Sequence, residues 1–169
     1  VIATENEGYV LAAPKLADSV SLSKNMVLTS KTIERVASLL PIQGDRIYAA
    51  GEDTGGQFAS LVPILIKGVN GAMSIGASLA NRELINMKEP FHFVGIVSKE
   101  NYNYPFMLTD AKLLDRYKFP NQVLLYDGNG EWPGVSYIEK GMQLFTLDAM
   151  GRQWIPRDST YIERAYQED

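Results

Sequence analysis

The chain has no cysteine and only one histidine among its 169 residues. Without cysteine there is no disulfide, no thiolate zinc site and no cysteine nucleophile, although this absence does not choose between cytoplasm and periplasm. Clusters of lysine and arginine interleaved with aromatics are also missing, and the formal net charge is -4. A protein of this charge is poorly suited to binding a phosphate backbone. We therefore expect no nucleic-acid partner.

Long hydrophobic runs are absent as well. No apolar stretch approaches the roughly 20 residues of a membrane-spanning helix, and the first residues lack the basic-then-apolar order of a signal peptide. We therefore expect no membrane insertion. The chain begins at Val1, partway into what reads as the end of a helix, so an upstream signal or a further domain could precede it.

Short apolar runs alternate with helical patterns along the chain, and 46% hydrophobic residues suffice for one domain with a core. Strands are predicted over residues 8–14, 46–51, 71–78, 91–97 and 121–128. Helices are predicted from Ser30 to Leu40 and over residues 56–66, 79–87, 108–117 and 136–150. This order predicts an α/β fold: a three-layer α/β/α sandwich around a mainly parallel sheet of about five strands, with functional loops at the carboxyl ends of the strands.

The end of the chain is predicted to be separate from this domain. Residues 1–150 form the sheet domain, and residues 151–169 form a helical extension. Thr160 and Glu163 fit a capping box that opens a last helix. A helix of about two turns is marginal alone, so it either docks on the sheet domain or starts a longer segment, and we favour the second.

One stretch, "AAGEDTGGQF" (residues 49–58), has the pattern of a nucleophile elbow. In such a turn, a strand runs sharply into a helix and holds its central residue in a strained backbone conformation, which requires small neighbours on both sides. Here the central residue is Asp53, flanked by Gly51, Gly55 and Gly56. The amide of Thr54 would form half of an oxyanion hole. An ordinary glycine-rich turn between strand and helix has the same spacing.

Four segments together resemble the later part of an α/β-hydrolase, most similar to bacterial esterases of the polyhydroxybutyrate depolymerase and feruloyl esterase type. They are "GYVLAAP" (8–14), "DRIYAAGEDTGGQFA" (45–59), "FHFVGIVSKENYNY" (91–104) and "LLYDGNGEWPG" (124–134). In those esterases, a segment of Gly-Gly-His-x-Trp-Pro type carries the catalytic histidine after the last strand. The resemblance implies a partial α/β-hydrolase fold over residues 8–150, whose earlier strands would precede Val1.

Carried over to this sequence, the family's catalytic triad is missing. The position of the nucleophile holds Asp53, the position of the acid holds Asn101, and the position of the histidine holds Gly130. A serine triad needs a hydroxyl, an imidazole to take its proton and a carboxylate to orient the imidazole. The resemblance therefore implies a non-catalytic homologue, a binding or interaction module that needs no cofactor. A secreted or periplasmic location is slightly favoured over the cytoplasm.

A hydrolase that uses Asp53 itself as nucleophile is an alternative, because epoxide hydrolases and haloalkane dehalogenases of this fold place aspartate in a similar Gly-x-Asp-x-Gly-Gly setting. The aspartate attacks carbon, and a water activated by histidine then cleaves the ester. The second step lacks its base, since Glu131 is a weak replacement for histidine. The only histidine, His92, starts a strand and is expected at the opposite edge of the sheet, in a structural role.

A binding site at the same edge is predicted from polar and aromatic residues in the loops. The candidate ligand-binding residues are Thr54, Glu100, Tyr102, Glu131 and Trp132. A small ester-like or glycan-derived ligand suits such a site, and so does a neighbouring domain or a second copy of the chain. The turn that follows Trp132 favours a packing role for its ring. Converging carboxylates also attract hard cations, but loop glutamates usually point into water, so we predict no metal site.

Overall fold

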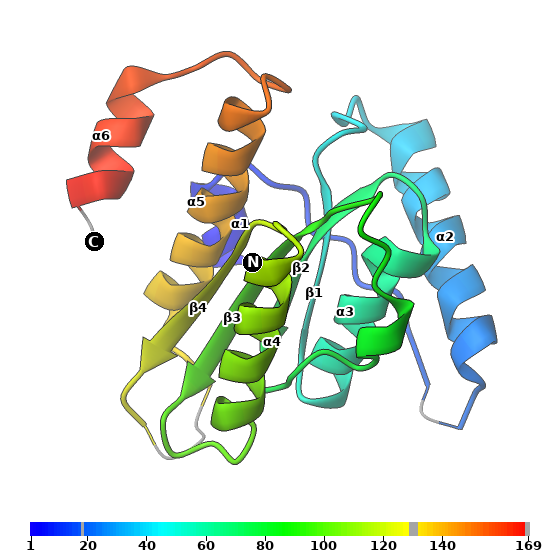
Figure 1. Ribbon diagram of the computed structural model, residues 1–169. Coiled ribbons are helices and arrows are strands. Elements are labelled where there is room, and N and C mark those ends of the chain that lie inside the picture. The colour runs from blue at the N-terminus through cyan, green and yellow to red at the C-terminus, as the bar shows by residue number, and fades with distance from the viewer. Residues whose placement is uncertain (18, 129–131, 168–169) are drawn as a thin grey trace.

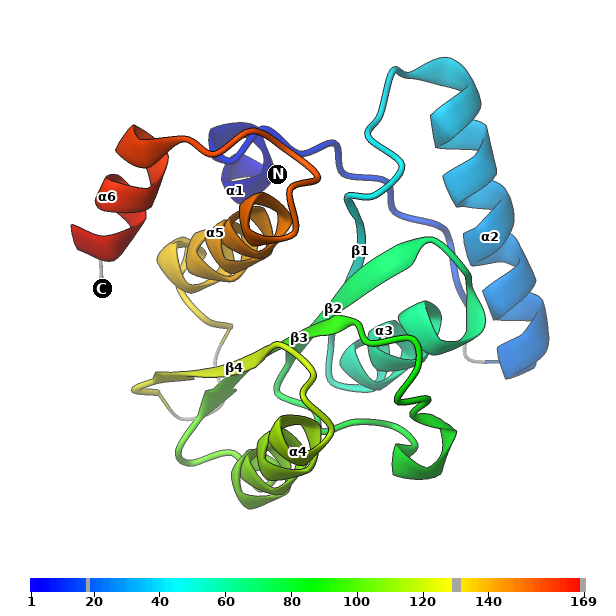
Figure 2. The same cartoon turned by 45° about the horizontal axis from the view of Figure 1, so that its top comes forward.

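The computed structural model describes residues 1–17, 19–128 and 132–167. Their core is an all-parallel sheet of four strands in the order β1 (Ile47–Glu52), β2 (Val69–Ile75), β3 (His92–Ser98) and β4 (Asn121–Tyr126). Figures 1 and 2 show helices on both faces of this sheet. The predicted α/β class and the parallel sheet are confirmed, and each of these strands begins within two residues of its predicted position.

The helices divide between the two faces of the sheet. One face carries α3 (Thr54–Leu65) and α4 (Tyr104–Arg116), with α2 (Leu22–Leu39) on the outer side of α3, and the other face carries α5 (Val135–Gly151). The short α1 (Ile2–Asn6) and the last helix, α6 (Ser159–Gln167), lie beside α5. Within the described residues, no helix combines the length and the apolar character needed to cross a bilayer.

The core has one apolar layer on each face of β3, a strand whose residues are all buried, and a third apolar cluster between α2, α3 and the start of β2. Successive side chains of a strand point to opposite faces. Accordingly, Phe93 packs toward Met107 of α4, whereas Val94 packs toward Phe145 of α5. Burial of both faces explains why β3 is a continuous apolar run rather than an alternating one. The rigid sheet fixes the positions of the loops at its carboxyl edge.

The strand predicted over residues 8–14 is wrong, and the sheet accordingly has four strands where about five were expected. These residues form no strand, and Val10 and Leu11 are exposed. A strand needs a neighbour for its backbone groups. Instead, the amide of Tyr9 donates to Thr4 O, and the hydroxyl of Tyr9 lies 2.9 Å from that of Thr146 on α5. The ring of Tyr9 also packs edge-on against Tyr48 of β1, so the start of the segment contacts β1 through a side chain and not through strand pairing.

Three helix predictions also need correction. The helix predicted to start at Ser30 already begins at Leu22, so that Ser30 lies in its middle. The helix predicted over residues 79–87 is a single 3-10 turn, η1 (Arg82–Leu84). The last helix is capped by Asp158, whose carboxylate accepts hydrogen bonds from the amides of Thr160 and Tyr161. The predicted capping box at Thr160 is therefore wrong.

Candidate functional site

The turn after β1 holds Asp53 in a strained backbone conformation. Its φ is +47° and its ψ is -117°, a combination that residues other than glycine rarely adopt. The amide of Asp53 donates a hydrogen bond of 2.9 Å to the carbonyl of Ile75 at the end of β2. The helix α3 begins at the next residue. The strain expected from the sequence is therefore present, and the neighbouring strand holds it in place.

Two glycines make this turn sterically feasible. A Cβ on Gly51 would lie 2.2 Å from the carbonyl oxygen of Gly55, and a Cβ on Gly56 would lie 2.5 Å from the hydroxyl oxygen of Ser74. Real Cβ atoms do not approach other atoms this closely, so only glycine fits at both positions. Ser74 is fully buried and donates to Ala77 O over 2.7 Å, which gives it a structural role beneath the turn.

The elbow presents its side chains to solvent. Asp53 and Thr54 are both exposed. Because Thr54 is the first residue of α3, its amide belongs to the first turn, whose N–H groups have no partner within the helix. Burial raises the pKa of Tyr126 at the end of β4, and the nearby carboxylates of Glu52 and Asp53 raise it further. The carboxylates of Glu52 and Asp53 thus lie close enough to act on the phenol of Tyr126.

The structure brings together, across Gly76, Asp53 and Asn101, the residues predicted at the nucleophile and acid positions. Gly76 follows β2 with φ +71°, and a Cβ placed on it would lie 3.2 Å from Asp53 Oδ1 and 3.3 Å from Asn101 Nδ2. The carboxylate and the amide therefore flank the same point of the backbone. A side chain at Gly76 would push them apart. A carboxylate acceptor beside an amide donor can bind a polar ligand, but the pair lacks the imidazole that a serine triad requires.

Asn103, which sequence reasoning missed, fixes this arrangement. Its amide N–H donates to Asn101 Oδ1 over 2.8 Å, and its side-chain Nδ2 donates to the carbonyl of Gly76 over 2.7 Å. Asn103 is buried, so these bonds are sheltered from water. They orient Asn101 with its Nδ2 toward Gly76. The motif Asn-x-Asn after a strand was a usable signal, because asparagine side chains commonly bond the backbone two residues on.

The other predicted site residues are more dispersed. Glu100 and Tyr102 are exposed in the loop after β3. Trp132 is 55% exposed, so its ring is not packed as predicted, whereas the adjoining Pro133 is fully buried and anchors the turn. Gly130 and Glu131 lie outside the described residues. Among the described residues, no group of three or more histidine, aspartate or glutamate side chains is placed to hold a metal ion.

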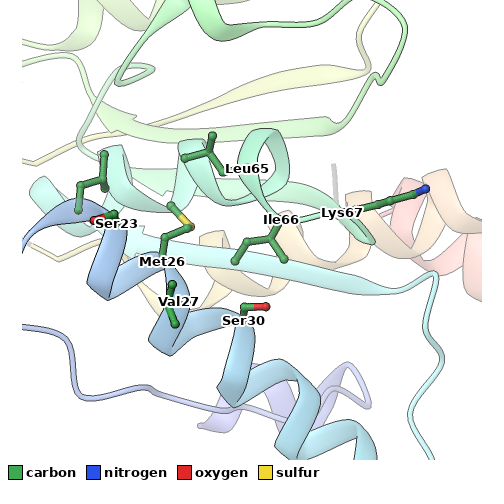
Figure 3. Close-up of a pocket in the computed structure, with 8 residues that line it drawn as sticks. Ser23, Met26, Val27, Ser30, Leu65, Ile66 and Lys67 are labelled. Carbon is green, nitrogen blue, oxygen red and sulfur yellow. The ribbon is translucent and has the colours of Figure 1, made fainter.

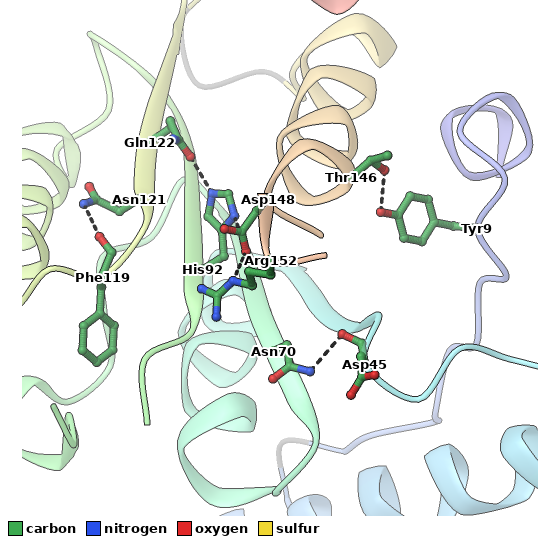
Figure 4. A network of polar contacts seen from close by, with 10 residues as sticks. All are labelled: Tyr9, Asp45, Asn70, His92, Phe119, Asn121, Gln122, Thr146, Asp148 and Arg152. Carbon is green, nitrogen blue, oxygen red and sulfur yellow. Dashed lines mark hydrogen bonds and ion pairs between the residues drawn. The ribbon is translucent and has the colours of Figure 1, made fainter. Parts of the chain in front are cut away.

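His92 lies at the opposite edge of the sheet from Asp53, as predicted. It is the first residue of β3 and is 2% exposed. Its Nε2 lies 2.5 Å from Gln122 Oε1, and its Nδ1 lies 3.5 Å from Asp148 Oδ2 (Figure 4). The length of a strand, roughly 20 Å, separates the two edges of the sheet. His92 is therefore too far from Asp53 to act on it.

Asp148 in this network is partly buried on α5. It also accepts a hydrogen bond of 2.7 Å from Arg152 Nε. Burial alone would raise its pKa, but hydrogen bonding to His92 and the charges of His92 and Arg152 outweigh burial and lower the pKa below its usual value. The network serves the packing of α5 on the sheet.

No protein-family model matches the chain, and no curated protein matches it with significant sequence similarity.

Proposed function

We propose that the chain is a non-catalytic α/β-hydrolase homologue that binds a ligand at the carboxyl edge of its sheet. The observation that carries this proposal is the contrast between Asp53 and His92. Asp53 sits at a strained, exposed turn of the kind that presents a nucleophile, whereas the only imidazole of the chain is engaged by Gln122 and Asp148 at the other edge. The presenting geometry is kept without the base that an esterase needs.

The ligand proposed for this edge is a small polar molecule, ester-like or derived from a glycan. Asp53 supplies a carboxylate acceptor, and Asn101 supplies an amide that Asn103 holds in place. The exposed rings of Tyr102 and Trp132 offer flat apolar faces on which a sugar ring or an aromatic ester can stack. Alternating apolar faces and fixed polar groups are the usual composition of a small-molecule site.

Tryptophan fluorescence tests binding directly, because one of the two tryptophans lies at this edge. In a Trp154→Phe variant, Trp132 is the only tryptophan, so excitation beyond the absorption band of tyrosine reports on this ring alone. Titration with xylo-oligosaccharides and with hydroxybutyrate oligomers should then give a saturable change with one of them, and Asp53→Ala should remove it. If no probe changes the emission of Trp132, the proposed ligand class is wrong.

Assays of p-nitrophenyl esters test the absence of catalysis. The wild-type protein should hydrolyse these esters no faster than an Asp53→Asn variant. Turnover well above the uncatalysed rate that disappears in Asp53→Asn would end the non-catalytic proposal. The same pair of proteins serves for the alternative below.

A hydrolase that uses Asp53 as nucleophile is the second candidate, favoured by the exposure and the strained backbone of Asp53. Its carboxylate oxygen would form a bond to the carbon of an epoxide or haloalkane while the carbon–oxygen or carbon–halogen bond breaks. A water molecule would then have to hydrolyse the resulting ester. With no imidazole nearby, this ester should accumulate. After incubation with styrene oxide, mass spectrometry should detect one adduct on Asp53 if the alternative holds and none if it does not.

A further inference from the structure

A hollow of about 620 Å³ lies between α2 and the end of α3 (Figure 3). Five of the eight residues that line it are apolar: Leu22, Met26 and Val27 on α2, and Leu65 and Ile66 at the end of α3. Met26 and Ile66 also belong to the third apolar cluster of the core, so the hollow borders the core. Its volume falls within the range of about 300–1,000 Å³ that is typical of small-molecule sites.

The apolar walls of this hollow are accessible to solvent. Leu22 is 50% exposed, Val27 is 55% exposed and Leu65 is 49% exposed. Among the 18 described residues of α2, Met26 alone is buried. Because the stability of a helix in a protein comes mostly from the packing of its apolar face, an apolar occupant of the hollow would complete the packing of α2 on α3.

Basic residues accompany the hollow. Lys67 belongs to its lining, and Lys24 and Lys31 each directly follow a lining residue on α2. With Arg35, these make four basic residues on the two helices and the short segment after α3, against one acidic residue, Glu34. In the part of the chain that the structure describes, none of the four takes part in an ion pair. Since the whole chain has a net charge of -4, these helices form a basic region on an acidic protein.

The polar part of the lining consists of hydrogen-bond donors that suit an anion. It is made of Ser23, Ser30 and Lys67. The hydroxyl of Ser30 donates a long bond of 3.5 Å to the carboxylate of Glu34 on the next turn, so it can turn toward a ligand at little cost. Hydroxyl and ammonium groups together bind the oxygens of a carboxylate or a phosphate. An anionic group attached to an apolar chain therefore matches both parts of the lining.

The size of the hollow favours a small molecule over a protein partner. Eight residues line it, whereas a stable protein–protein interface involves about 20–30 residues on each side. Small-molecule sites have mostly apolar walls with a few polar groups that fix the orientation of the ligand. Five apolar and three polar residues agree with that composition.

We infer that the hollow between α2 and α3 binds an anionic amphiphile with a single alkyl chain, such as a fatty acid. The alkyl chain lies between Met26 and Val27 on one wall and Leu65 and Ile66 on the other, and Lys67 binds the carboxylate. The 12 residues of α3, about 18 Å of helix, separate this site from the turn at Asp53. The inference is therefore independent of the function proposed for the carboxyl edge of the sheet.

Isothermal titration calorimetry with dodecanoate, below its micelle concentration, tests this site. We expect saturable binding of one molecule per chain, weaker binding of dodecyltrimethylammonium, which carries a cationic head on the same alkyl chain, and no binding of acetate, which lacks the chain. Lys67→Gln should weaken the binding of dodecanoate several-fold without weakening that of dodecyltrimethylammonium. Arg157→Gln is the matched control, because it removes one positive charge from the lining of a second hollow, of about 650 Å³, at the end of α5.

Filling the hollow tests the position of the site independently of charge. Val27 is exposed, so Val27→Trp should fold, and its ring should occupy the hollow and abolish the binding of dodecanoate. Leu28→Trp, at the next position and outside the lining, should bind as the wild type does. In the wild type, dodecanoate should slow hydrogen exchange in residues 22–30 and 65–67, because a ligand stabilises the segments that it contacts.

Three results would overturn the inference. The first is a wild-type protein that binds no dodecanoate. The second is binding that survives both Lys67→Gln and Val27→Trp, and the third is binding that Arg157→Gln removes, which would place the ligand in the hollow at the end of α5. If dodecanoate does not bind but the protein sediments with vesicles of phosphatidylglycerol, the basic region serves a membrane surface instead.

Discussion

Tyr161 in the last helix donates a hydrogen bond of 2.6 Å to the carboxylate of Glu7, which lies just after the first helix. The other oxygen of Glu7 accepts a bond of 3.2 Å from Gln143 on α5. One carboxylate therefore joins the start of the chain, a core helix and the extension predicted for residues 151–169. No residue of α6 is buried, so its position depends heavily on this contact.

Replacement of Tyr161 by phenylalanine should release α6. The change removes a bond to a charged acceptor, which contributes about 1–2 kcal/mol when partly buried. We expect faster hydrogen exchange throughout residues 159–167 and earlier proteolysis there, with little change in the sheet. Tyr166→Phe is the matched control, because Tyr166 is 81% exposed. Equal exchange rates in Tyr161→Phe and wild type would mean that other contacts hold the helix.

Alkaline solution should release α6 in the same way. Burial raises the pKa of Tyr161, and the hydrogen bond to Glu7 raises it further, so the folded state disfavours the ionised phenol. The stabilisation is present below the ordinary tyrosine pKa of about 10 and is lost as the pH rises above it. Proteolysis of residues 159–167 should accelerate above about pH 10 in the wild type but not in Tyr161→Phe, where it is already fast.

Substitution of Asp53 by glycine should stabilise the protein. A residue with a side chain at φ +47° stores strain of about 1–3 kcal/mol, of which glycine relieves most while it costs some backbone entropy. We expect the free energy of unfolding in urea to rise by about 1 kcal/mol. Asp45→Gly, at a position without positive φ, should lower it instead. A stability loss in Asp53→Gly would show that the carboxylate contributes more than the strain costs.

The elbow and the sheet were predictable because their signals are local. Gly51, Asp53 and Gly56 lie within six consecutive residues, and the steric demand of the turn falls on those residues themselves. Residues 8–14, which were wrongly predicted to form a strand, have the same kind of short apolar run as the true strands. Its outcome depends on Tyr9, whose hydroxyl meets Thr146 far along the chain. A strand exists only when a neighbour accepts its hydrogen bonds, and no local pattern records that neighbour.

The polar partners at the site were missed for a related reason. Gly76 brings Asp53 and Asn101 together because the three neighbouring parallel strands β1, β2 and β3 end side by side, and Asn103 then bonds the carbonyl of Gly76. The order of strands places such groups at one edge, but which side chains turn toward each other depends on backbone angles such as φ +71° at Gly76. The position of His92 was predictable, since it follows from the direction of a single strand.

Substitutions of Asp110 on α4 should show how much a buried carboxylate and its hydrogen bonds contribute to the free energy of unfolding. It is fully buried and accepts bonds from the amide of Leu79 at 2.8 Å and from Arg82 Nε at 2.5 Å. Burial raises its pKa, although both hydrogen bonds oppose the change. Asp110→Ala leaves the buried Leu79 amide without its acceptor and should lower the free energy of unfolding by about 2–3 kcal/mol. Asp110→Asn keeps an acceptor and should lose less.

The pH dependence of Asp110 follows from the direction of its pKa. A carboxyl whose pKa is higher in the folded state favours folding most when it is protonated, so this contribution falls as the pH rises through the ordinary aspartate value toward the raised one. The stability of wild type relative to Asp110→Asn should therefore be greatest near pH 3 and smaller near pH 7, values chosen on either side of an aspartate pKa of about 3.9. A difference that grows with pH would mean that Arg82 dominates.

Asp148 should show the opposite dependence, because its pKa is lowered in the folded state. Although burial opposes ionisation, His92, whose Nδ1 lies 3.5 Å from Asp148 Oδ2, and Arg152, whose Nε lies 2.7 Å from the same oxygen, favour the carboxylate. The resulting stability is present above the unfolded pKa of about 3.9 and is lost as the pH falls below it. Asp148→Asn should therefore cost about 1–2 kcal/mol at neutral pH and progressively less in acid.

Chemical denaturation of both proteins at a series of pH values measures this difference. Asp45→Asn provides the control, since Asp45 is exposed and its side chain takes part in no ion pair of the described residues. The wild-type and Asp148→Asn curves should converge only at pH values below the lowered pKa of folded Asp148, where the carboxyl is protonated in both folded and unfolded chains. If the gap stays constant, the loss comes from packing, and His92 and Arg152 do not stabilise α5 through charge. A closing gap would show that the contacts of Asp148 with His92 and Arg152 stabilise the packing of α5 on the sheet through charge.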